Sequence, residues 1–284
     1  MKVPFRLVDV FAERPLAGNQ LCVVPENPGL DDTAMQGLAS EIGFSETTFV
    51  TEASSDRYSM RIFTPGAELP FAGHPTLGTA FVLVSEGRVR SPATQVVKAG
   101  EFEVEADPTT NTARMRQLPP AFGPIASDLQ EVAEAAGLSV RDLRPDLPPQ
   151  VVSTGLPHLI VPAASVSAVK HAERNDGTLA RLLRDVGAEG YYLFALSSGE
   201  AKARMFDTEF GIGEDPATGS AAGPLAAYLT AHRAGGMPGT IRIRQGEEIG
   251  RPSLLEANVV QVEDTLKVTV GGGVFVVGEG TFET

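Results

Sequence analysis

Residues 74–80 read HPTLGTA, and residues 215–221 read DPATGSA. The two copies share a residue that can cap a helix, then proline, two residues, glycine, serine or threonine, and alanine. Each copy follows a strand-like segment and opens a long apolar stretch, which predicts a helix. A motif that returns about 140 positions later indicates two similar domains with an equivalent central helix in each.

The predicted central helices are residues 75–86 and 216–231. Asp215 before a proline is a strong N-cap, and capping alone can explain it. His74 is a poorer cap, so we weigh a structural and a functional role for it equally. Helix starts bind anions through unpaired N–H groups, and two of them facing one cleft would hold a small carboxylate.

Glycine and a hydroxyl residue recur at the same place inside both copies of the motif. Gly78 and Gly219 cost roughly 1 kcal/mol each in a helix relative to alanine, which indicates close approach of a ligand or of the sheet. Thr79 and Ser220 can donate a hydroxyl to a ligand or bond within the first helical turn. Both pairs of alternatives stay open at this point.

The domain boundaries follow from length and composition. A chain of 284 residues suits two domains, each able to bury its own core. We expect an N-terminal domain over residues 1–118, a proline-rich linker at 118–124 and a C-terminal domain over 126–270. Residues 271–284 would form a terminal strand that can return to the N-terminal domain. We interpret the three glycines at 271–273 as a turn between two strands.

The charge of the chain limits the classes of partner. Its net charge is −13 and it shows no Lys/Arg cluster, which argues against nucleic acid. No apolar run reaches the roughly 18 residues of a membrane span, so no membrane partner is expected. The negative field repels anions at long range, so a carboxylate substrate needs strong local donors.

Cysteine and histidine usage bears on metals and location. Cys22 is the single cysteine, which excludes an intramolecular disulfide and fits a reducing cytoplasm. The four histidines lack metal-ligand spacing, so we expect no metal site.

Two further polar residues stand out locally. Glu46 begins a run of buried-looking residues, where apolar surroundings would raise its pKa toward that of a general base. The alternative is a solvated glutamate at a strand start, which the local sequence favours. Asn19 lies in a turn between Gly18 and Gln20; it can offer an amide to a ligand, but the turn alone accounts for it.

Several separate stretches together resemble the phenazine-biosynthesis PhzF-like family, which has the diaminopimelate-epimerase-like fold. They span almost the full length in family order: VDVFAERPLAGNQLCVV (8–24), GFSETTFV (43–50), RIFTPGAELPFAGHPTLGTAFVL (61–83), EDPATGSAAGPLAAYL (214–229), RQGEEIGRPS (244–253) and VGGGVFVVGEG (270–280). The resemblance implies an α/β (α+β) fold of two pseudo-symmetric domains, each a curved, barrel-like sheet around a central helix. It also implies an active site between the domains, and members are commonly homodimers.

The resemblance assigns site residues as well. Its catalytic glutamate falls on Glu46, its site histidine on His74, its site aspartate on Asp215 and its serine on Ser220. Gly73 lies at the ligand, where related epimerases carry one of two catalytic cysteines. This chain has no cysteine at either thiol position, so a two-thiol mechanism is not available to it.

The function that we expect is a cofactor-independent isomerase that moves a proton on a small carboxylate-bearing substrate. Glu46, His74 and Asp215 would be catalytic, and Asn19, Gly73, Gly219 and Ser220 would bind substrate. One alternative is a small-molecule binding protein without catalysis on the same fold. The other is an amino-acid epimerase that uses carboxylates.

Overall fold

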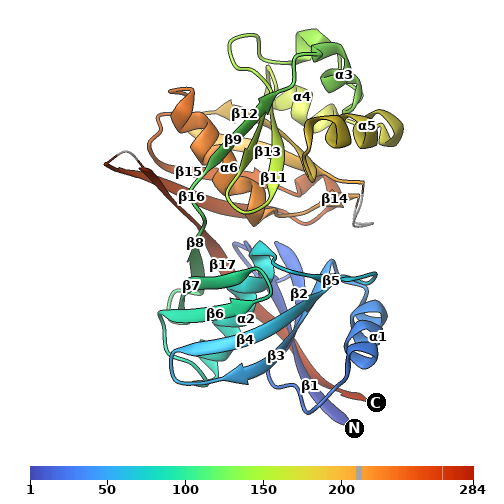
Figure 1. Cartoon of the computed structure of the whole chain (residues 1–284), viewed down its shortest axis with the longest axis vertical. Helices are drawn as coiled ribbons and strands as arrows, with labels where there is room; N and C mark the ends of the chain where they lie inside the picture. The colour runs from blue at the N-terminus through green and yellow to red at the C-terminus, as the bar shows by residue number, and fades with distance from the viewer. Residues whose placement is uncertain (209–212, 264) are drawn as a thin grey trace. The chain divides into compact units, whose positions relative to one another are not determined.

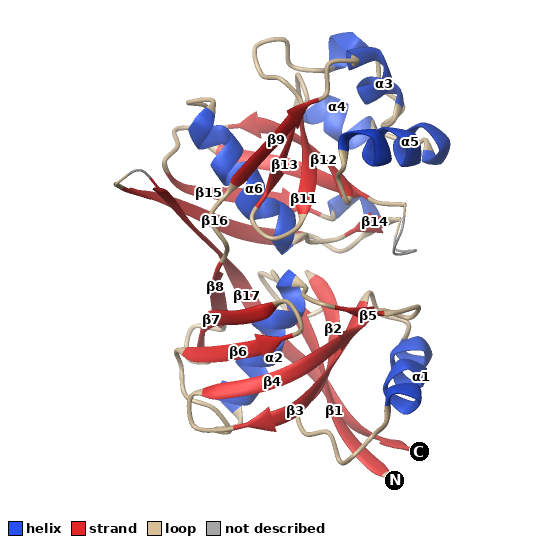
Figure 2. Cartoon of the chain, viewed as in Figure 1, coloured by secondary structure: helices blue, strands red, loops and turns tan. Residues whose placement is uncertain are grey.

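The structure is a computed structural model that describes residues 1–208, 213–263 and 265–284. The chain forms two compact units, labelled by element in Figure 1. Unit 1 is Met1–Arg116 with Gly271–Thr284, and unit 2 is Gln117–Val270. Each unit consists mainly of strands, with few helices (Figure 2).

The sheet of unit 1 closes on itself. Its strands are β1 (Lys2–Val10), β2 (Asn19–Val24), β3 (Glu46–Ala53), β4 (Arg57–Phe63), β5 (Glu68–Leu69), β6 (Ala93–Val97), β7 (Gly100–Asp107), β8 (Thr112–Arg116) and the second part of β17 (Thr265–Glu283). Pairing runs β1–β2–β3–β4–β6–β7–β8–β17 and returns to β1. Closure leaves neither β1 nor β8 with an open edge.

Helix α2 (Gly73–Ser85) fills this barrel-like sheet. Every residue from Gly73 to Leu83 is buried, and the helix contacts β1, β2, β3, β6, β7 and β8. A helix that is apolar nearly all round needs such an enclosure, because no face of it suits water. The expected curved sheet around a central helix is therefore confirmed. Outside the sheet, α1 (Asp32–Ile42) covers β3 and β4 with Met35, Leu38 and Ala39.

Unit 2 repeats this plan and adds outer helices. Its elements are β9 (Ala121–Ile125), α3 (Leu129–Glu134), the 3-10 helix η1 (Val140–Asp142), β10 (Gln150–Ser153), β11 (Pro157–Pro162), α4 (Val166–His171), α5 (Asp176–Val186), β12 (Gly190–Ser197), β13 (Glu200–Phe206), β14 (Glu214–Asp215), α6 (Gly219–Ala231), β15 (Gly239–Gln245), η2 (Glu247–Ile249), β16 (Ser253–Val262) and the start of β17. Strands pair in the order β9–β10–β11–β12–β13–β15–β16. The central helix α6 packs on β10, β11, β15 and β16.

The glycine run at 271–273 is not a turn, and that prediction is wrong. These residues lie inside β17, which continues from Thr265 to Glu283. A Cβ on Gly271 would lie 2.7 Å from the carbonyl oxygen of Ala113, and one on Gly273 would lie 2.0 Å from that of Ala12. Glycine is needed here because neighbouring backbone passes too close for any side chain.

The segment expected as a linker is also partly ordered in a sheet. Residues 121–125 form β9, which pairs antiparallel with β10 and sets Phe122 opposite Val152. The prolines of this segment led us to predict a linker between the domains. A strand that contains proline is nevertheless tolerated at the edge of a sheet, where β9 lies. Among the helices of the described residues, none is long and apolar enough to cross a membrane.

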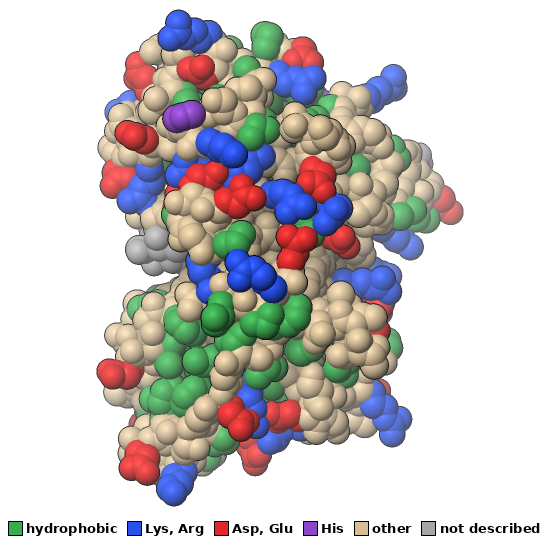
Figure 3. Space-filling model, turned by 180° about the vertical axis from the view of Figure 1, so that it is seen from behind, with side chains coloured by type: hydrophobic (Ala, Val, Ile, Leu, Met, Phe, Trp, Pro, Cys, Tyr) green, Lys and Arg blue, Asp and Glu red, His purple; other side chains and the backbone are tan. Residues whose placement is uncertain are grey.

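The charges of the surface are mixed in sign. On the face drawn in Figure 3, Asp and Glu side chains are interspersed with Lys and Arg side chains. Ion pairs such as Arg144–Asp146 at 2.8 Å and Arg242–Glu200 at 3.0 Å are partly exposed, so each contributes little to stability.

Candidate functional site

The first group of polar side chains lies in unit 1, where β2, β3 and α2 begin. Asn19 opens β2, Glu46 opens β3, and His74 is the second residue of α2. Parallel pairing of β2 with β3 sets Leu21 beside Glu46, so both strands begin at the same edge. Asn19 is 1% exposed, His74 5% and Glu46 8%. The local interpretation of Glu46 as a solvated glutamate is therefore wrong.

A directed chain of contacts links these side chains. Ser45 Oγ donates to Asn19 Oδ1 at 3.3 Å, and Asn19 Nδ2 donates to His74 Nδ1 at 3.2 Å. A neutral imidazole that accepts at Nδ1 carries its proton on Nε2. His74 Nε2 lies 3.3 Å from Glu46 Oε2. The site thus holds an imidazole nitrogen and a carboxylate oxygen close together and buried, and two such titratable groups are what general acid–base chemistry needs.

His74 does not cap its helix, which corrects the motif analysis. The N-cap of α2 is Ala72, whose side chain makes no capping hydrogen bond, and the helix begins at Gly73. Thr76 Oγ1 donates to the carbonyl of Ala72 at 2.8 Å. Since the first turn of a helix has N–H groups without intrahelical partners, Gly73 and His74 stand at an anion-binding position.

Packing explains the other two motif residues in unit 1. A Cβ on Gly78 would lie 2.5 Å from Leu21 Cδ2 and 2.9 Å from Val10 Cγ2, so glycine lets α2 approach the sheet. Thr79 Oγ1 bonds with Thr48 Oγ1 on β3 at 2.8 Å, and both residues are fully buried. The sheet, and not a ligand, accounts for Gly78 and Thr79.

Asp215 is not the N-cap of α6, and that prediction is wrong. It lies in β14, opposite Met205 of β13, and the N-cap of α6 is Thr218. The short ladder with β13 keeps the backbone extended until the helix begins at Gly219. The Asp215 carboxylate instead accepts a hydrogen bond from Thr218 Oγ1 at 2.6 Å.

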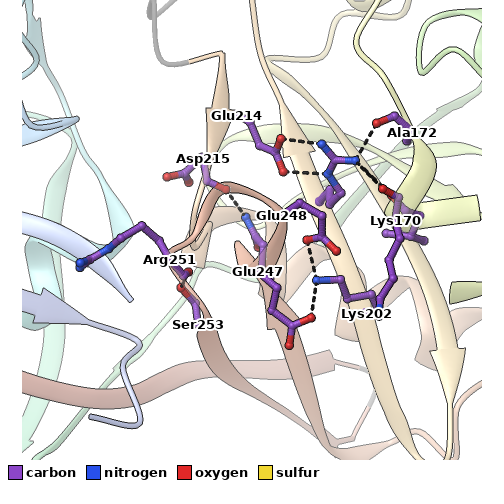
Figure 4. A network of polar contacts seen from close by, with 12 residues as sticks. Lys170, Ala172, Lys202, Glu214, Asp215, Glu247, Glu248, Arg251 and Ser253 are labelled. Atoms are coloured by element: carbon purple, nitrogen blue, oxygen red, sulfur yellow. Dashed lines mark hydrogen bonds and ion pairs between the residues drawn. The ribbon is translucent and has the colours of Figure 1, made fainter. Parts of the chain in front are cut away.

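Gln245 clamps this turn from the end of β15. Its Nε2 donates to the carbonyl of Asp215 at 2.7 Å and to Thr218 Oγ1 at 2.9 Å. In Figure 4 the first contact is the dashed line at the labelled Asp215. Its Oε1 accepts from Tyr192 Oη at 3.0 Å and from the Thr218 N–H at 3.3 Å. Gln245 is fully buried, so these contacts hold the Asp215 turn rigidly. The sequence analysis missed Gln245, since no spacing rule links residues so far apart.

Ser220 is the second residue of α6, directly after Gly219. Its Oγ lies 3.0 Å from Nε2 of His158, a residue for which the sequence analysis gave no role. His158 begins the apolar stretch HLIVP of β11. A histidine among residues typical of a buried strand was the signal that could have found it.

Each unit has an arginine–glutamate pair in an equivalent place, between β4 and β5 in unit 1 and between β13 and β14 in unit 2. Arg61 binds Glu68 with Nε–Oε1 at 2.7 Å, and its guanidinium lies 5.0 Å from the ring centre of Phe63. In unit 2, Arg204 binds Glu214 with Nη2–Oε2 at 2.7 Å. Dashed lines at the labelled Glu214 mark this pair in Figure 4. The guanidinium of Arg204 lies 4.9 Å from the ring centre of Phe206.

These pairs establish which residues of the two units correspond. The glutamates open ELPFAG (68–73) and EDPATG (214–219), and both stretches end on the first residue of a 13-residue helix. The repeat that the structure supports is therefore E-x-P-x-x-G. It makes His74 the counterpart of Ser220, and not of Asp215 as the motif HPTLGTA and DPATGSA predicted.

Neither thiol chemistry nor a clustered metal site is evident around these residues. Cys22 lies in β2 and is fully buried, and burial raises its pKa to about 12. The reactive thiolate is thus suppressed. Within the described ranges 1–208, 213–263 and 265–284, no three His, Cys, Asp or Glu residues gather as a metal ion would need.

Solved structures share this architecture. A PhzF-family phenazine biosynthesis protein from Bacillus anthracis covers all of both chains, with a TM-score of 0.91 and 27% identity. A protein from Pseudomonas aeruginosa, named a predicted epimerase, is 35% identical with a TM-score of 0.86 and covers 99% of both chains. A probable proline racemase from Agrobacterium radiobacter, at 12% identity and a TM-score of 0.67, shares the fold alone. The class is thus the racemase-like and PhzF-like fold.

The sequence comparisons narrow this class. Residues 8–280 match the profile of the phenazine biosynthesis-like protein family, PhzC-PhzF. The trans-2,3-dihydro-3-hydroxyanthranilate isomerase of Pseudomonas chlororaphis is 35% identical over 97% of both chains. An uncharacterised isomerase of Clostridium acetobutylicum is 30% identical over 95% of this chain and 94% of its own. The chain belongs to the PhzC-PhzF family and is an isomerase.

Proposed function

We propose that this protein moves a proton between two carbons of a small carboxylate-bearing substrate, with Glu46 as general base and without a cofactor. The observation that carries the proposal is the buried contact of 3.3 Å between Glu46 Oε2 and His74 Nε2. A carboxylate buried with an imidazole gives the site both a base and a proton donor. The names of the curated isomerase relatives support this class of reaction.

The reaction balances without a redox partner. Glu46 takes a proton from a carbon that a neighbouring carboxylate or double bond makes acidic. The electrons of the broken C–H bond move into the conjugated system, and a second carbon receives a proton from Glu46 or from His74 Nε2–H. One hydrogen and one double bond change place, and the contact between the two side chains restores their protons.

Substrate binding is assigned to the helix starts and their neighbours. Gly73 and Gly219 would offer backbone N–H groups to a carboxylate, and such donors also stabilise charge that develops during the reaction. Ser220 would add a hydroxyl. Asp215 would share in proton transfer, held in place by Thr218. The joint use of both units by one substrate stays a prediction, as do the homodimer and the cytoplasmic location.

The side chain of Asn19 has a further role in this proposal. Because its Nδ2 donates to His74 Nδ1 and its Oδ1 accepts from Ser45, it orients the imidazole. Direct contact of Asn19 with substrate stays a prediction.

The test uses trans-2,3-dihydro-3-hydroxyanthranilate, the substrate in the name of the Pseudomonas relatives, and related unsaturated carboxylates. Deuterium uptake from solvent into a substrate carbon is followed by NMR. Glu46→Gln should bind substrate but lose about 10²–10⁴-fold in kcat. Glu52→Gln, on the exposed end of β3, is the matched control and should keep wild-type turnover. Undiminished exchange in Glu46→Gln would rule out Glu46 as the base.

The second candidate is an amino-acid epimerase that uses carboxylates. It is favoured by the structural match to the Pseudomonas aeruginosa protein named a predicted epimerase. The same deuterium experiment separates the two reactions: epimerisation labels a Cα and inverts its configuration, whereas the proposed isomerisation labels a carbon that did not carry the proton before. Inversion without migration of a double bond would replace our proposal with this one.

A further inference from the structure

His158 is a buried histidine that the proposed reaction does not use. It lies in β11, is 2% exposed, and directs Nε2 at Ser220 Oγ from 3.0 Å. Its Nδ1 has no hydrogen-bond partner among the residues that the structure describes. A polar ring in an apolar strand costs stability unless its contact has a use, so this pair needs an explanation.

Comparison of the two units shows what His158 replaces. In unit 1, Thr47 pairs with Phe63; in unit 2, Tyr191 pairs with Phe206. The residue before each is the first of its strand, which makes Gly190 the counterpart of Glu46.

In unit 1 the residue beside Glu46 is Leu21, and in unit 2 the residue beside Gly190 is His158. A Cβ on Gly190 would lie only 3.1 Å from His158 Nδ1 and 1.9 Å from Met205 Cε. A side chain at position 190 would therefore require the end of Met205 to move away and His158 to shift slightly. In unit 1 the carboxylate of Glu46, at the start of β3, contacts His74, the second residue of α2. In unit 2 the contact to the equivalent helix residue, Ser220, comes from His158 on the neighbouring strand β11.

The proton of His158 has one favourable position. Burial lowers the pKa of His158 to about 4, so the ring is neutral near pH 7 and carries a single N–H. A proton on Nδ1 would be a buried donor without a partner, which proteins avoid more strictly than an unused acceptor. A proton on Nε2 bonds to Ser220 Oγ. The tautomer with Nε2–H therefore fits the surroundings.

We propose that His158 is a positioning residue whose Nε2–H donates to Ser220 Oγ, so that the Ser220 hydroxyl donates its own proton to an anionic oxygen of the substrate. A hydroxyl has one proton, and its oxygen here accepts from a fixed donor. The Ser220 proton is then directed away from His158, at a helix start suited to a carboxylate. Accepting one hydrogen bond also strengthens the one that the hydroxyl donates. The substrate role of Ser220 rests on the proposed function.

The tautomer is tested in the wild-type protein without any substrate. Long-range ¹H–¹⁵N correlation spectra distinguish a protonated ring nitrogen from a bare one. We expect His158 to show a protonated Nε2 and a bare Nδ1 near neutral pH. A protonated Nδ1 would overturn the proposal, whatever the fate of the proposed reaction, because Ser220 would then have to donate to the ring.

The consequence for ligands is tested by calorimetric titration with benzoate as a carboxylate probe. His158→Leu, which installs the residue found at the counterpart Leu21, should weaken binding about fivefold, as expected for one hydrogen bond. His158→Gln retains a donor at a similar reach and should restore most of the affinity. His171→Leu removes an exposed histidine of the same unit that also contacts a serine, and it should change nothing.

Two further measurements separate positioning from mere packing. In a Ser220→Ala background, His158→Leu should have no additional effect on benzoate, because its partner is gone. In turnover, His158→Leu should raise KM about fivefold and leave kcat within about threefold, whereas Glu46→Gln lowers kcat. Equal benzoate affinity in wild type and His158→Leu, additive losses in the double variant, or no benzoate binding by the wild type would each contradict the proposal.

Discussion

At the residue scale, the chemistry depends on burial of a few polar groups in apolar surroundings. Glu46 and His74 lie against each other with little exposure, and Asn19 fixes the direction of the imidazole. In unit 2 the equivalent helix position carries Ser220, which faces His158. Both units thus place buried polar contacts where the strands of the sheet meet the start of the central helix.

The buried state of His158 predicts a loss of stability in mild acid. Its pKa is about 4 in the folded protein and 6.5 in the unfolded chain, so the unfolded chain binds the proton first as pH falls. The full stability is present above pH 6.5 and declines toward pH 4, by about 3 kcal/mol from this group. Urea unfolding at a series of pH values measures it. His158→Leu should lose that much less free energy over the same range; parallel pH profiles of the two proteins would refute the argument.

Cys22 should be chemically silent in the native protein. It is fully buried in β2 with a pKa raised to about 12, so almost no thiolate forms near neutral pH. A chromogenic disulfide reagent should leave the native protein unmodified while it modifies the urea-unfolded chain completely. Cys22→Ala should keep kcat within about twofold of wild type, since no step uses the thiol. A large loss of turnover in a folded Cys22→Ala protein would show that thiol chemistry had been wrongly excluded.

At the scale of elements, strand and helix starts supply the functional side chains. Asn19, Glu46, His74 and Ser220 all stand within two residues of the start of an element. Parallel pairing of β2 with β3 and of β11 with β12 brings such starts to one edge of each sheet. Loops and element ends can vary in sequence without disturbing the core, which is why function concentrates there.

Replacing a glycine of β17 by alanine should destabilise the protein more where neighbouring backbone lies closer to that glycine. Gly273→Ala would place a Cβ 2.0 Å from the carbonyl oxygen of Ala12, so the strands must separate. We expect a loss of at least about 2 kcal/mol in the free energy of unfolding. Gly278→Ala, in the same strand, meets nothing closer than 3.5 Å and should cost less than about 1 kcal/mol. Denaturant melts of the two variants provide the comparison, and equal stabilities would contradict the close-approach explanation.

At the scale of the whole molecule, the chain leaves unit 1 after Arg116 and returns to it at Gly271. The returning part of β17 pairs with β1 and β8 and so closes the sheet of unit 1. The N–H of Thr284 donates to the carbonyl of Met1 at 2.9 Å, so the two ends of the chain meet. Unit 1 is therefore built from both ends of the sequence.

This topology predicts that the protein tolerates a covalent link between its two termini but does not tolerate deletion of its C-terminal residues. A circular permutant that links Thr284 to Met1 and opens the exposed turn between Ser55 and Asp56 should fold, because β17 keeps its neighbours. Deletion of 271–284 should prevent stable folding, since β1 and β8 become open edges. Circular dichroism and thermal melts of the two proteins test this. A stable, soluble deletion protein would mean that β17 is dispensable for unit 1.

Short-range signals in the sequence were enough to predict the family and the fold class, and they named the residues of the candidate site. Apolar periodicity located the two central helices to within a few residues, because a helix that is apolar on all sides must be enclosed. The resemblance in the SET and GHP motifs pointed to Glu46 and His74, which the structure brings together. Each of these signals is carried by residues that lie within one short stretch of the chain.

Only the tertiary structure decided the register of the repeat and the partners of its polar groups. Asp215 lies in an extended turn because pairing with β13 outweighs its preference as a cap, and Gln245 reaches that turn from another strand. The local sequence predicts a turn at the glycines 271–273. The structure shows that the carbonyl oxygens of Ala12 and Ala113 lie too close to Gly273 and Gly271 for a side chain there. The contact of His158 with Ser220 likewise depends on how α6 packs against β11. Such contacts join residues distant in sequence, and strand register and helix packing set them, which no local pattern encodes.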